Sequence, residues 1–223
     1  MKSKVKIAPS LLSADFTNLS REIKLCEKGG ADMLHLDIMD GQFVPNITFG
    51  PLILEHIRKL TELEISTHLM VINPDEYIPK FAELGSDYIS FHCEAVPHIH
   101  RTLQLIRSFG KKAGLAINPL TPIEYAFEAA EYCDFILLMS VNPGFGGQSF
   151  ITNFYKRAYA LKDFLIRNDL ETVEIEVDGG VKIDNAKEIV AVGADILVSG
   201  SGIFSGDIVK NIKSMRNIIN YNN

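Results

Sequence analysis

The sequence lacks tryptophan, has only three cysteines, and contains no apolar run long enough to span a membrane. A membrane helix needs about 20 successive apolar residues, and no stretch here approaches that length. The first residues, MKSKVKIAPSLL, show no cleavage-site pattern after their short apolar stretch. We therefore expect no membrane partner and a cytoplasmic location.

The cysteines are also too scattered to form a recognisable site. Cys26, Cys93 and Cys133 lie among apolar neighbours without CxxC spacing, which is typical of small buried side chains in a reducing compartment. This pattern argues against a disulfide framework and against a thiolate centre.

Basic residues are fewer than acidic ones. The chain carries 22 Lys and Arg against 28 Asp and Glu, a net charge of −6, and it has no arginine-rich segment to neutralise a phosphate backbone. We expect no nucleic-acid partner. With 223 residues, 47% of them hydrophobic, the composition suits one globular domain over residues 1–223, or at most two small ones.

Short β-branched or apolar runs alternate with helical spacing along the whole chain. Helical spacing is present at Phe16, Leu19, Ile23 and Cys26, at Phe154, Ala158, Leu161 and Leu165, and at Ile208, Ile212, Met215 and Ile219. The predicted strands are VKIAPSL, MLHLDIM, LEISTHLMV, YISFHCE, KAGLAIN, FILLMSV, VEIEVDG and ILVSG. Glycines in GGAD, LGSD and VGAD mark places where a helix ends before a strand. Eight such units predict a single-domain (β/α)8 TIM barrel, with a doubly wound open sheet as the alternative.

Polar residues stand late in several of these strands, where a barrel builds its active site. His35, Asp37, His68 and Asp178 would converge from three strands, and two imidazoles with two carboxylates suit a divalent transition ion. A single strand-end histidine is more often structural, so the prediction depends on the set. Asp40 lies on the other strand phase and is expected to serve as a turn or capping residue.

Glycine-rich segments follow the last three predicted strands: NPGFGGQSF, DGGV and SGSGIF. Backbone amides without side chains can approach an anion closely, and none of the three segments contains lysine or arginine. We therefore predict a phosphate held mainly by backbone N–H groups, although glycine also simply permits tight turns. NPGFGGQSF is a candidate lid in which Phe145 and Phe150 could cover a substrate. The long segment GQFVPNITFG carries Phe43, Val44 and Phe49 and could also cover a substrate; the equally weighted alternative is a packed loop or a subunit contact.

Eight segments together resemble the ribulose-phosphate 3-epimerase family over nearly the whole chain: IAPSLLSADF, HLDIMDGQFVPNITFGP, HLMV, FHCEA, NPLTP, MSVNPGFGGQSFI, EVDGGV and GSGIF. The resemblance implies an enzyme of the pentose phosphate pathway that interconverts D-ribulose 5-phosphate and D-xylulose 5-phosphate. This chain departs from the family pattern at Gln42, where the family commonly has histidine, and at Gly202, where the family commonly has alanine.

The resemblance also implies roles for individual residues. The metal ligands would be His35, Asp37, His68 and Asp178, holding one divalent ion per subunit, either zinc, iron, manganese or cobalt. Asp37 and Asp178 would also be the catalytic acid/base pair. Three methionines, Met39, Met70 and Met139, would form an apolar wall around the reacting carbons. Substrate-binding positions would be Ser10, His68, Gly144, Phe145, Gly146, Gly147, Gly179, Gly180, Gly200 and Ser201. We expect a homo-oligomer of undefined size.

Inversion at a carbon beside a ketone requires a proton to leave one face and another to arrive on the opposite face, so two acid/base groups are needed. Asp37 and Asp178 would serve in this way through an enediolate intermediate. There are three alternatives, and the missing lysine argues against the second of them. The first is a 3-epimerase of a six-carbon ketose phosphate such as D-allulose 6-phosphate. The second, a related barrel group of decarboxylases and aldolases, uses an Asp-x-Lys pair, which Asp37-Ile38-Met39 lacks. The third is a non-catalytic sugar-phosphate binder.

Overall fold

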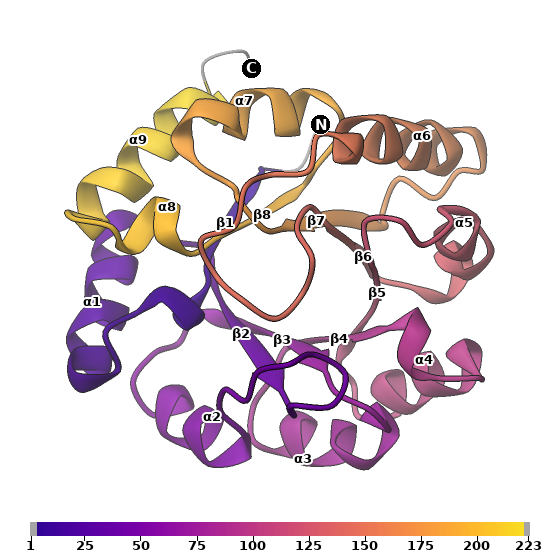
Figure 1. Ribbon diagram of the computed structural model, residues 1–223, viewed down its shortest axis with the longest axis horizontal. Coiled ribbons are helices and arrows are strands. Elements are labelled where there is room, and N and C mark those ends of the chain that lie inside the picture. The colour runs from indigo at the N-terminus through magenta and orange to yellow at the C-terminus, as the bar shows by residue number, and fades with distance from the viewer. Residues whose placement is uncertain (1–3, 221–223) are drawn as a thin grey trace.

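The computed structural model describes residues 4–220, which form a ring of eight parallel strands surrounded by helices (Figure 1). The strands are β1 (Lys6–Pro9), β2 (Met33–Met39), β3 (Glu64–Met70), β4 (Tyr88–His92), β5 (Lys112–Ile117), β6 (Phe135–Met139), β7 (Glu174–Asp178) and β8 (Ile196–Ser199). The α-helices are α1 (Leu19–Gly29), α2 (Pro51–Arg58), α3 (Ile78–Glu83), α4 (Ile99–Ser108), α5 (Glu124–Ala129), α6 (Asn153–Arg167), α7 (Ile183–Ala191), α8 (Ser201–Phe204) and α9 (Ile208–Asn220). The predicted (β/α)8 barrel is confirmed, and the open sheet is excluded.

The ring closes where two of the predicted site residues meet. Hydrogen-bonded neighbours run in the order β1, β8, β7, β6, β5, β4, β3 and β2. The two ends of that order are joined by an isolated parallel bridge between Ser10, just beyond β1, and His35 on β2. Closure therefore brings the start of the chain beside the polar end of β2.

The predicted helix ends are confirmed by backbone geometry. α1 stops at Gly29 and is followed by Gly30 with φ of 89°, a left-handed conformation that glycine adopts without steric cost. The predicted apolar residues of α6 and α9 are buried. Phe16 differs: Asp15 caps a short 3₁₀ turn over Phe16–Asn18, so α1 begins only at Leu19 and Phe16 is 44% exposed.

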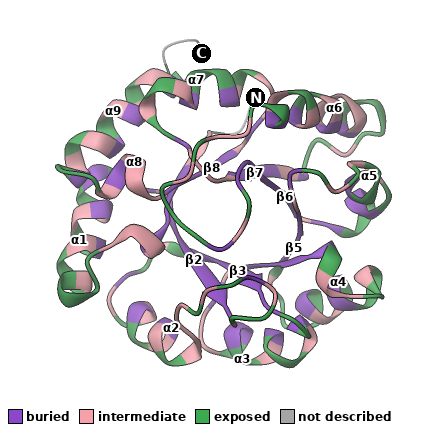
Figure 2. Cartoon of the chain, in the orientation of Figure 1, coloured by how far each residue is buried: buried purple, intermediate pink, exposed green. Residues whose placement is uncertain are grey.

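Two apolar layers stabilise the barrel, one between strands and helices and one inside the ring. The strands are buried along most of their length, whereas the helices expose their outer faces (Figure 2). Inside the ring, a Cβ added to Gly114 would lie 2.2 Å from the ring of Phe135, so the glycine makes room for that side chain. Side chains of the strands thus fill this part of the barrel interior.

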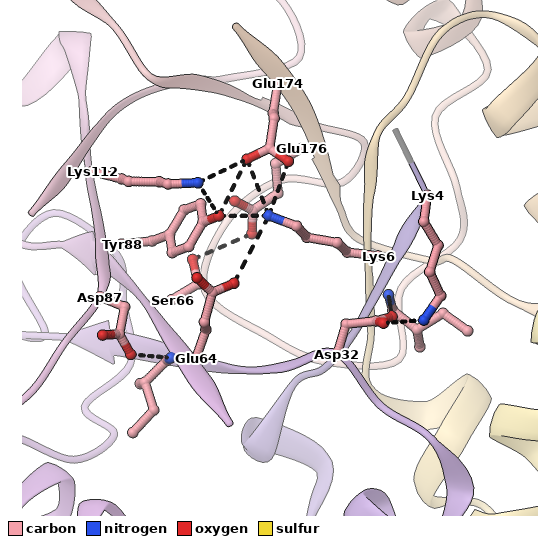
Figure 3. Close-up of polar contacts among 12 residues, drawn as sticks. Lys4, Lys6, Asp32, Glu64, Ser66, Asp87, Tyr88, Lys112, Glu174 and Glu176 are labelled. Carbon is pink, nitrogen blue, oxygen red and sulfur yellow. Dashed lines mark hydrogen bonds and ion pairs between the residues drawn. The ribbon is translucent and has the colours of Figure 1, made fainter. Parts of the chain in front are cut away.

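The amino-terminal end of the ring is closed by polar contacts (Figure 3). The Tyr88 hydroxyl accepts hydrogen bonds from the Nζ atoms of Lys6 (2.5 Å) and Lys112 (2.6 Å). Glu174 Oε1 lies 2.9 Å from Lys6 Nζ. Along β7 the acidic side chains Glu174, Glu176 and Asp178 alternate with buried Ile175 and Val177, so the three acids share the inner face of the strand at successive levels.

The three cysteines are buried and unpaired, as predicted. Among residues 4–220, no helix combines the length and apolar character needed to cross a membrane.

Candidate metal and active site

The structure brings the four predicted metal ligands together at the carboxyl ends of the strands. His35 and Asp37 come from β2, His68 from β3 and Asp178 from β7. One ligand atom from each lies within 4.8 Å of all the others. Both histidines are fully buried and Asp37 is 3% exposed, so the cluster lies beneath the mouth of the barrel.

Ring nitrogens and carboxylate oxygens face one another across a small space. Asp37 Oδ1 lies 3.4 Å from His35 Nε2 and 3.4 Å from His68 Nδ1. Asp178 Oδ2 lies 3.6 Å from the same His68 nitrogen. Neither His35 Nε2 nor His68 Nδ1 makes a hydrogen bond of regular geometry within the described residues. Buried nitrogens aimed at two carboxylates form a donor set that suits a divalent transition ion.

The acids and imidazoles of this cluster strongly affect one another's ionisation. Burial opposes protonation of His35, but Asp37 and Glu176 outweigh it and raise the pKa of His35. Burial likewise opposes ionisation of Asp37, yet His35 and His68 lower its pKa below the usual range. The carboxylates therefore favour positive charge in this space, which either protons or a metal ion can supply.

The second oxygen of Asp37 has a different partner. Ser10 Oγ donates a buried hydrogen bond of 2.6 Å to Asp37 Oδ2, while Oδ1 faces the imidazoles. Thr48 Oγ1 donates to the backbone carbonyl of Asp37, at 2.6 Å, and accepts from the N–H of Met39. The carboxylate is therefore oriented, with one oxygen toward the cluster and the other toward Ser10.

Three residues to which the sequence analysis gave no role lie outside the cluster: Glu176 and His92 each contact a ligand histidine, and Glu94 contacts His92. Glu176 Oε1 lies 3.0 Å from His35 Nδ1, outside the angular range of a regular hydrogen bond. His92 Nε2 lies 2.8 Å from His68 Nε2, and His92 Nδ1 is hydrogen-bonded to Glu94. An acidic residue within a buried strand was a visible signal for Glu176. His92 and Glu94 follow from the pairing of β4 beside β3, which periodicity alone does not reveal.

A pocket opens above the cluster. Asp37 and Asp178 line it together with Met39, Met70 and Met139, all of which are nearly fully buried. Of the predicted substrate-binding residues, His68 lies beneath the pocket. The others line its wall: Ser10, Gly144, Phe145, Gly146, Gly147, Gly179, Gly180, Gly200 and Ser201.

The glycine-rich turns after β6, β7 and β8 form one side of this pocket, and none of the described residues lining it is lysine or arginine. Gly179 has φ of 117°, and a Cβ there would lie 2.4 Å from Val141 Cγ2 and 2.9 Å from Val141 N. Ser140 Oγ lies 2.9 Å from the carbonyl oxygen of Asp178 and 2.7 Å from that of Gly179, and donates to both. The turn is thus held close to β6 in a conformation that favours glycine.

The segment between β6 and α6 crosses the centre of the ring (Figure 1). Phe145 lines the pocket and is 55% exposed. Phe150 does not cover the pocket, contrary to our expectation, because its ring packs against Phe154 and Tyr155 at the start of α6. Val141 and residues 143–148 form the part of the segment that lines the pocket.

The loop over residues 41–50 is packed against this segment. Val44 is buried with Met39 and Met70, and Asn46 Nδ2 donates to the carbonyl oxygen of Gly144 at 2.9 Å. Asp40 has the predicted turn role: its carboxylate accepts from three backbone N–H groups, those of residues 42, 43 and 72. The interpretation as a packed loop is confirmed, and a subunit contact through it stays a prediction.

A family model and two similar proteins all point to the same family. The family model described as the ribulose-phosphate 3 epimerase family matches residues 6–204. The chain is 48% identical to a ribulose-phosphate 3-epimerase of Bacillus subtilis, covering 95% of this chain and 98% of that protein. It is 49% identical to a ribulose-phosphate 3-epimerase of Aquifex aeolicus, covering 96% of each.

The fold also resembles that of a mutant tryptophan synthase alpha-subunit from Pyrococcus furiosus, with a TM-score of 0.71 and 16% identity over 99% of this chain and all of that one. At this identity the likeness concerns the fold alone.

Proposed function

Because the chain belongs to the ribulose-phosphate 3-epimerase family, it is an epimerase acting on carbohydrates, and we propose that it interconverts D-ribulose 5-phosphate and D-xylulose 5-phosphate. The observation that carries this proposal is the placement of two carboxylates, Asp37 and Asp178, in one pocket with three glycine turns. We further propose a cytoplasmic enzyme of the pentose phosphate pathway that forms a homo-oligomer.

The substrate would lie across the barrel mouth. Its phosphate would contact backbone N–H groups of the turns at Gly144–Gly147, Gly179–Gly180 and Gly200–Ser201, which line the same side of the pocket. Its carbon chain would lie against Met39, Met70 and Met139, whose polarizable side chains can fit a planar intermediate. This orientation would bring the reacting carbon between the two carboxylates.

Asp37 and Asp178 would exchange the C3 proton. They come from β2 and β7 and so approach the pocket from different sides of the ring. One carboxylate would remove the proton while the other, initially protonated, delivers its proton to the opposite face of the enediolate. The direction of the reaction decides which of the two begins as the base.

The contacts of Asp37 support a role for this side chain in both metal binding and proton transfer. Its Oδ1 faces His35 and His68, whereas Oδ2 accepts the Ser10 hydrogen bond. We assign metal ligation to Oδ1 and proton transfer to Oδ2. Ser10 would then keep Oδ2 directed at the substrate and offset part of its charge.

The metal ligands would be His35, Asp37, His68 and Asp178, whose facing buried atoms fit a divalent ion. Such an ion, when bound, supplies a positive charge that stabilises the negative charge developing on the ketone and hydroxyl oxygens of the substrate. Zinc, iron, manganese and cobalt are all compatible with this mixed nitrogen and oxygen donor set.

The proposal is tested by comparing two substrates with and without metal. The purified enzyme is treated with a chelator, then supplied separately with each of the four ions, and assayed with D-ribulose 5-phosphate and D-allulose 6-phosphate. We expect activity to be lost on chelation, to return with metal, and to show the larger kcat/KM for the five-carbon sugar. Full activity after verified metal removal, or a larger kcat/KM for the six-carbon sugar, would overturn the corresponding part of the proposal.

A further inference from the structure

His68 is contacted on two sides, and only one of them faces the pocket. Its Nδ1 points toward Asp37 and Asp178. Its Nε2 points the other way and lies 2.8 Å from Nε2 of His92 on the neighbouring strand. Both imidazoles are fully buried, so water does not compete for this contact.

Glu94 holds the far side of His92. Its Oε2 lies 3.2 Å from His92 Nδ1, and its Oε1 accepts hydrogen bonds from the Asn118 N–H, at 2.9 Å, and from the Thr121 hydroxyl. Both carboxylate oxygens are therefore engaged. Phe43 covers the His92 ring, with the two ring centroids 4.7 Å apart.

The chemistry of these groups determines where the protons lie. An ionised carboxylate can only accept hydrogen bonds, so Nδ1 of His92 carries a hydrogen and donates it to Glu94. In a neutral His92 the opposite nitrogen, Nε2, is then an acceptor, and His68 must donate its Nε2–H across the 2.8 Å contact. The remaining nitrogen of His68, Nδ1, is left with a free lone pair aimed at the cluster.

We propose that His92 and Glu94 are positioning residues that fix the tautomer and ring orientation of His68, so that its Nδ1 is presented to a divalent metal ion. This inference rests on the proposed function, in which His68 is a metal ligand. Residues that hydrogen-bond to metal ligands commonly fix the ligand in this way, and their loss typically lowers metal affinity by about 10- to 100-fold. Here the carboxylate acts through a second imidazole.

The two ligand histidines would therefore present different ring nitrogens. His35 faces the cluster with Nε2, and Glu176 lies near its Nδ1. His68 faces the cluster with Nδ1 and is held at Nε2. Because His92 contacts His68 and Glu94 contacts His92, we expect substitution of either residue to affect metal binding through His68 alone.

The test uses Co²⁺, whose visible absorption reports its ligands. We would measure the dissociation constant of Co²⁺ by competition with a chelator, together with the absorption spectrum, for the wild type and four variants. His92→Phe keeps a buried ring without an acceptor, His92→Gln retains a carbonyl oxygen that can accept from His68, and Glu94→Ala leaves both imidazoles in place. Thr121→Val is the matched control, because it removes a hydrogen bond to Glu94 on the side away from His92.

We expect His92→Phe to weaken Co²⁺ binding by about 10- to 100-fold and to alter the spectrum. Glu94→Ala should have a smaller effect in the same direction, His92→Gln should restore most of the affinity, and Thr121→Val should change it less than about 3-fold. If His92→Phe does not fold, Glu94→Ala provides the decisive comparison. Wild-type affinity and spectrum in a folded His92→Phe or Glu94→Ala variant would overturn the inference. Failure of the wild type itself to bind Co²⁺ at this site would instead overturn the proposed function.

Discussion

Ser10→Ala tests whether the two carboxylate oxygens of Asp37 have different roles, Oδ1 in metal ligation and Oδ2 in proton transfer. The change removes the hydroxyl that donates to Asp37 Oδ2 at 2.6 Å, and it leaves Oδ1 beside His35 and His68. Because the proposal assigns proton transfer to Oδ2 and metal ligation to Oδ1, the variant should lose catalysis without losing metal.

The expected loss follows from the type of hydrogen bond. A hydrogen bond to a charged group contributes about 1.5–3 kcal/mol, and each 1.36 kcal/mol of transition-state stabilisation corresponds to about tenfold in rate. We therefore expect kcat/KM to fall by about 10- to 150-fold. Ser10 Oγ also accepts from the Leu12 N–H at the start of a 3₁₀ turn, so a small loss of stability should accompany the change.

The assay is steady-state epimerisation of D-ribulose 5-phosphate, together with metal content and urea unfolding of the same preparation. Ser66→Ala is a suitable control, because it removes a buried hydroxyl within the barrel that contacts Glu176 at 3.5 Å and does not contact Asp37. An unchanged kcat/KM in Ser10→Ala, or a loss of activity fully restored by excess metal, would refute the assignment of the two oxygens.

Three further predictions concern the rest of the molecule. Tyr88→Phe should lower the free energy of unfolding by about 1–3 kcal/mol, because it removes the hydroxyl between Lys6 and Lys112. Its kcat/KM should be unchanged, since Tyr88 lies at the amino-terminal end of the barrel; urea unfolding and kinetics check both statements. Burial opposes ionisation of Glu94, but hydrogen bonds from His92, Thr121 and Asn118 lower its pKa from about 4.5 to about 2. Its stabilisation should therefore be complete above about pH 4.5 and be lost as the pH falls toward 2. The difference in unfolding free energy between wild type and Glu94→Gln should accordingly shrink between pH 6 and pH 3, and a constant difference would contradict this. Gly179→Ala should raise KM and reduce stability, because its Cβ would meet Val141 at φ of 117°. Gly206→Ala, with φ of 92° and open space around the Cβ, should reduce stability without changing KM.

The barrel was predictable because each of its units carries local signals. All eight strands were identified, since buried parallel strands are continuous apolar runs and the helices between them have apolar residues on one face. Gly30, Gly85 and Gly193 adopt positive φ where helices end. The start of α1 was less predictable, because the short 3₁₀ turn capped by Asp15 has apolar spacing compatible with a helix.

The clustering of His35, Asp37, His68 and Asp178 could also be predicted, because strand phase and the carboxyl end of a parallel barrel specify where such side chains converge. The contacts between His92 and His68 could not, since they depend on the register of β4 against β3 and on side-chain rotamers. The same reason applies to Phe150, whose packing against α6 depends on the path of the whole segment.

Incorporation of deuterium from the solvent shows whether Asp37 and Asp178 exchange the C3 proton of the substrate. Epimerisation in D₂O, followed by NMR at metal saturation, should give wild-type product with one deuterium at C3. Asp37→Asn and Asp178→Asn should each reduce turnover by about 10²- to 10⁴-fold, the usual contribution of a general acid or base. Wild-type product that retains its original C3 hydrogen, or normal turnover in either variant, would contradict the two-base mechanism.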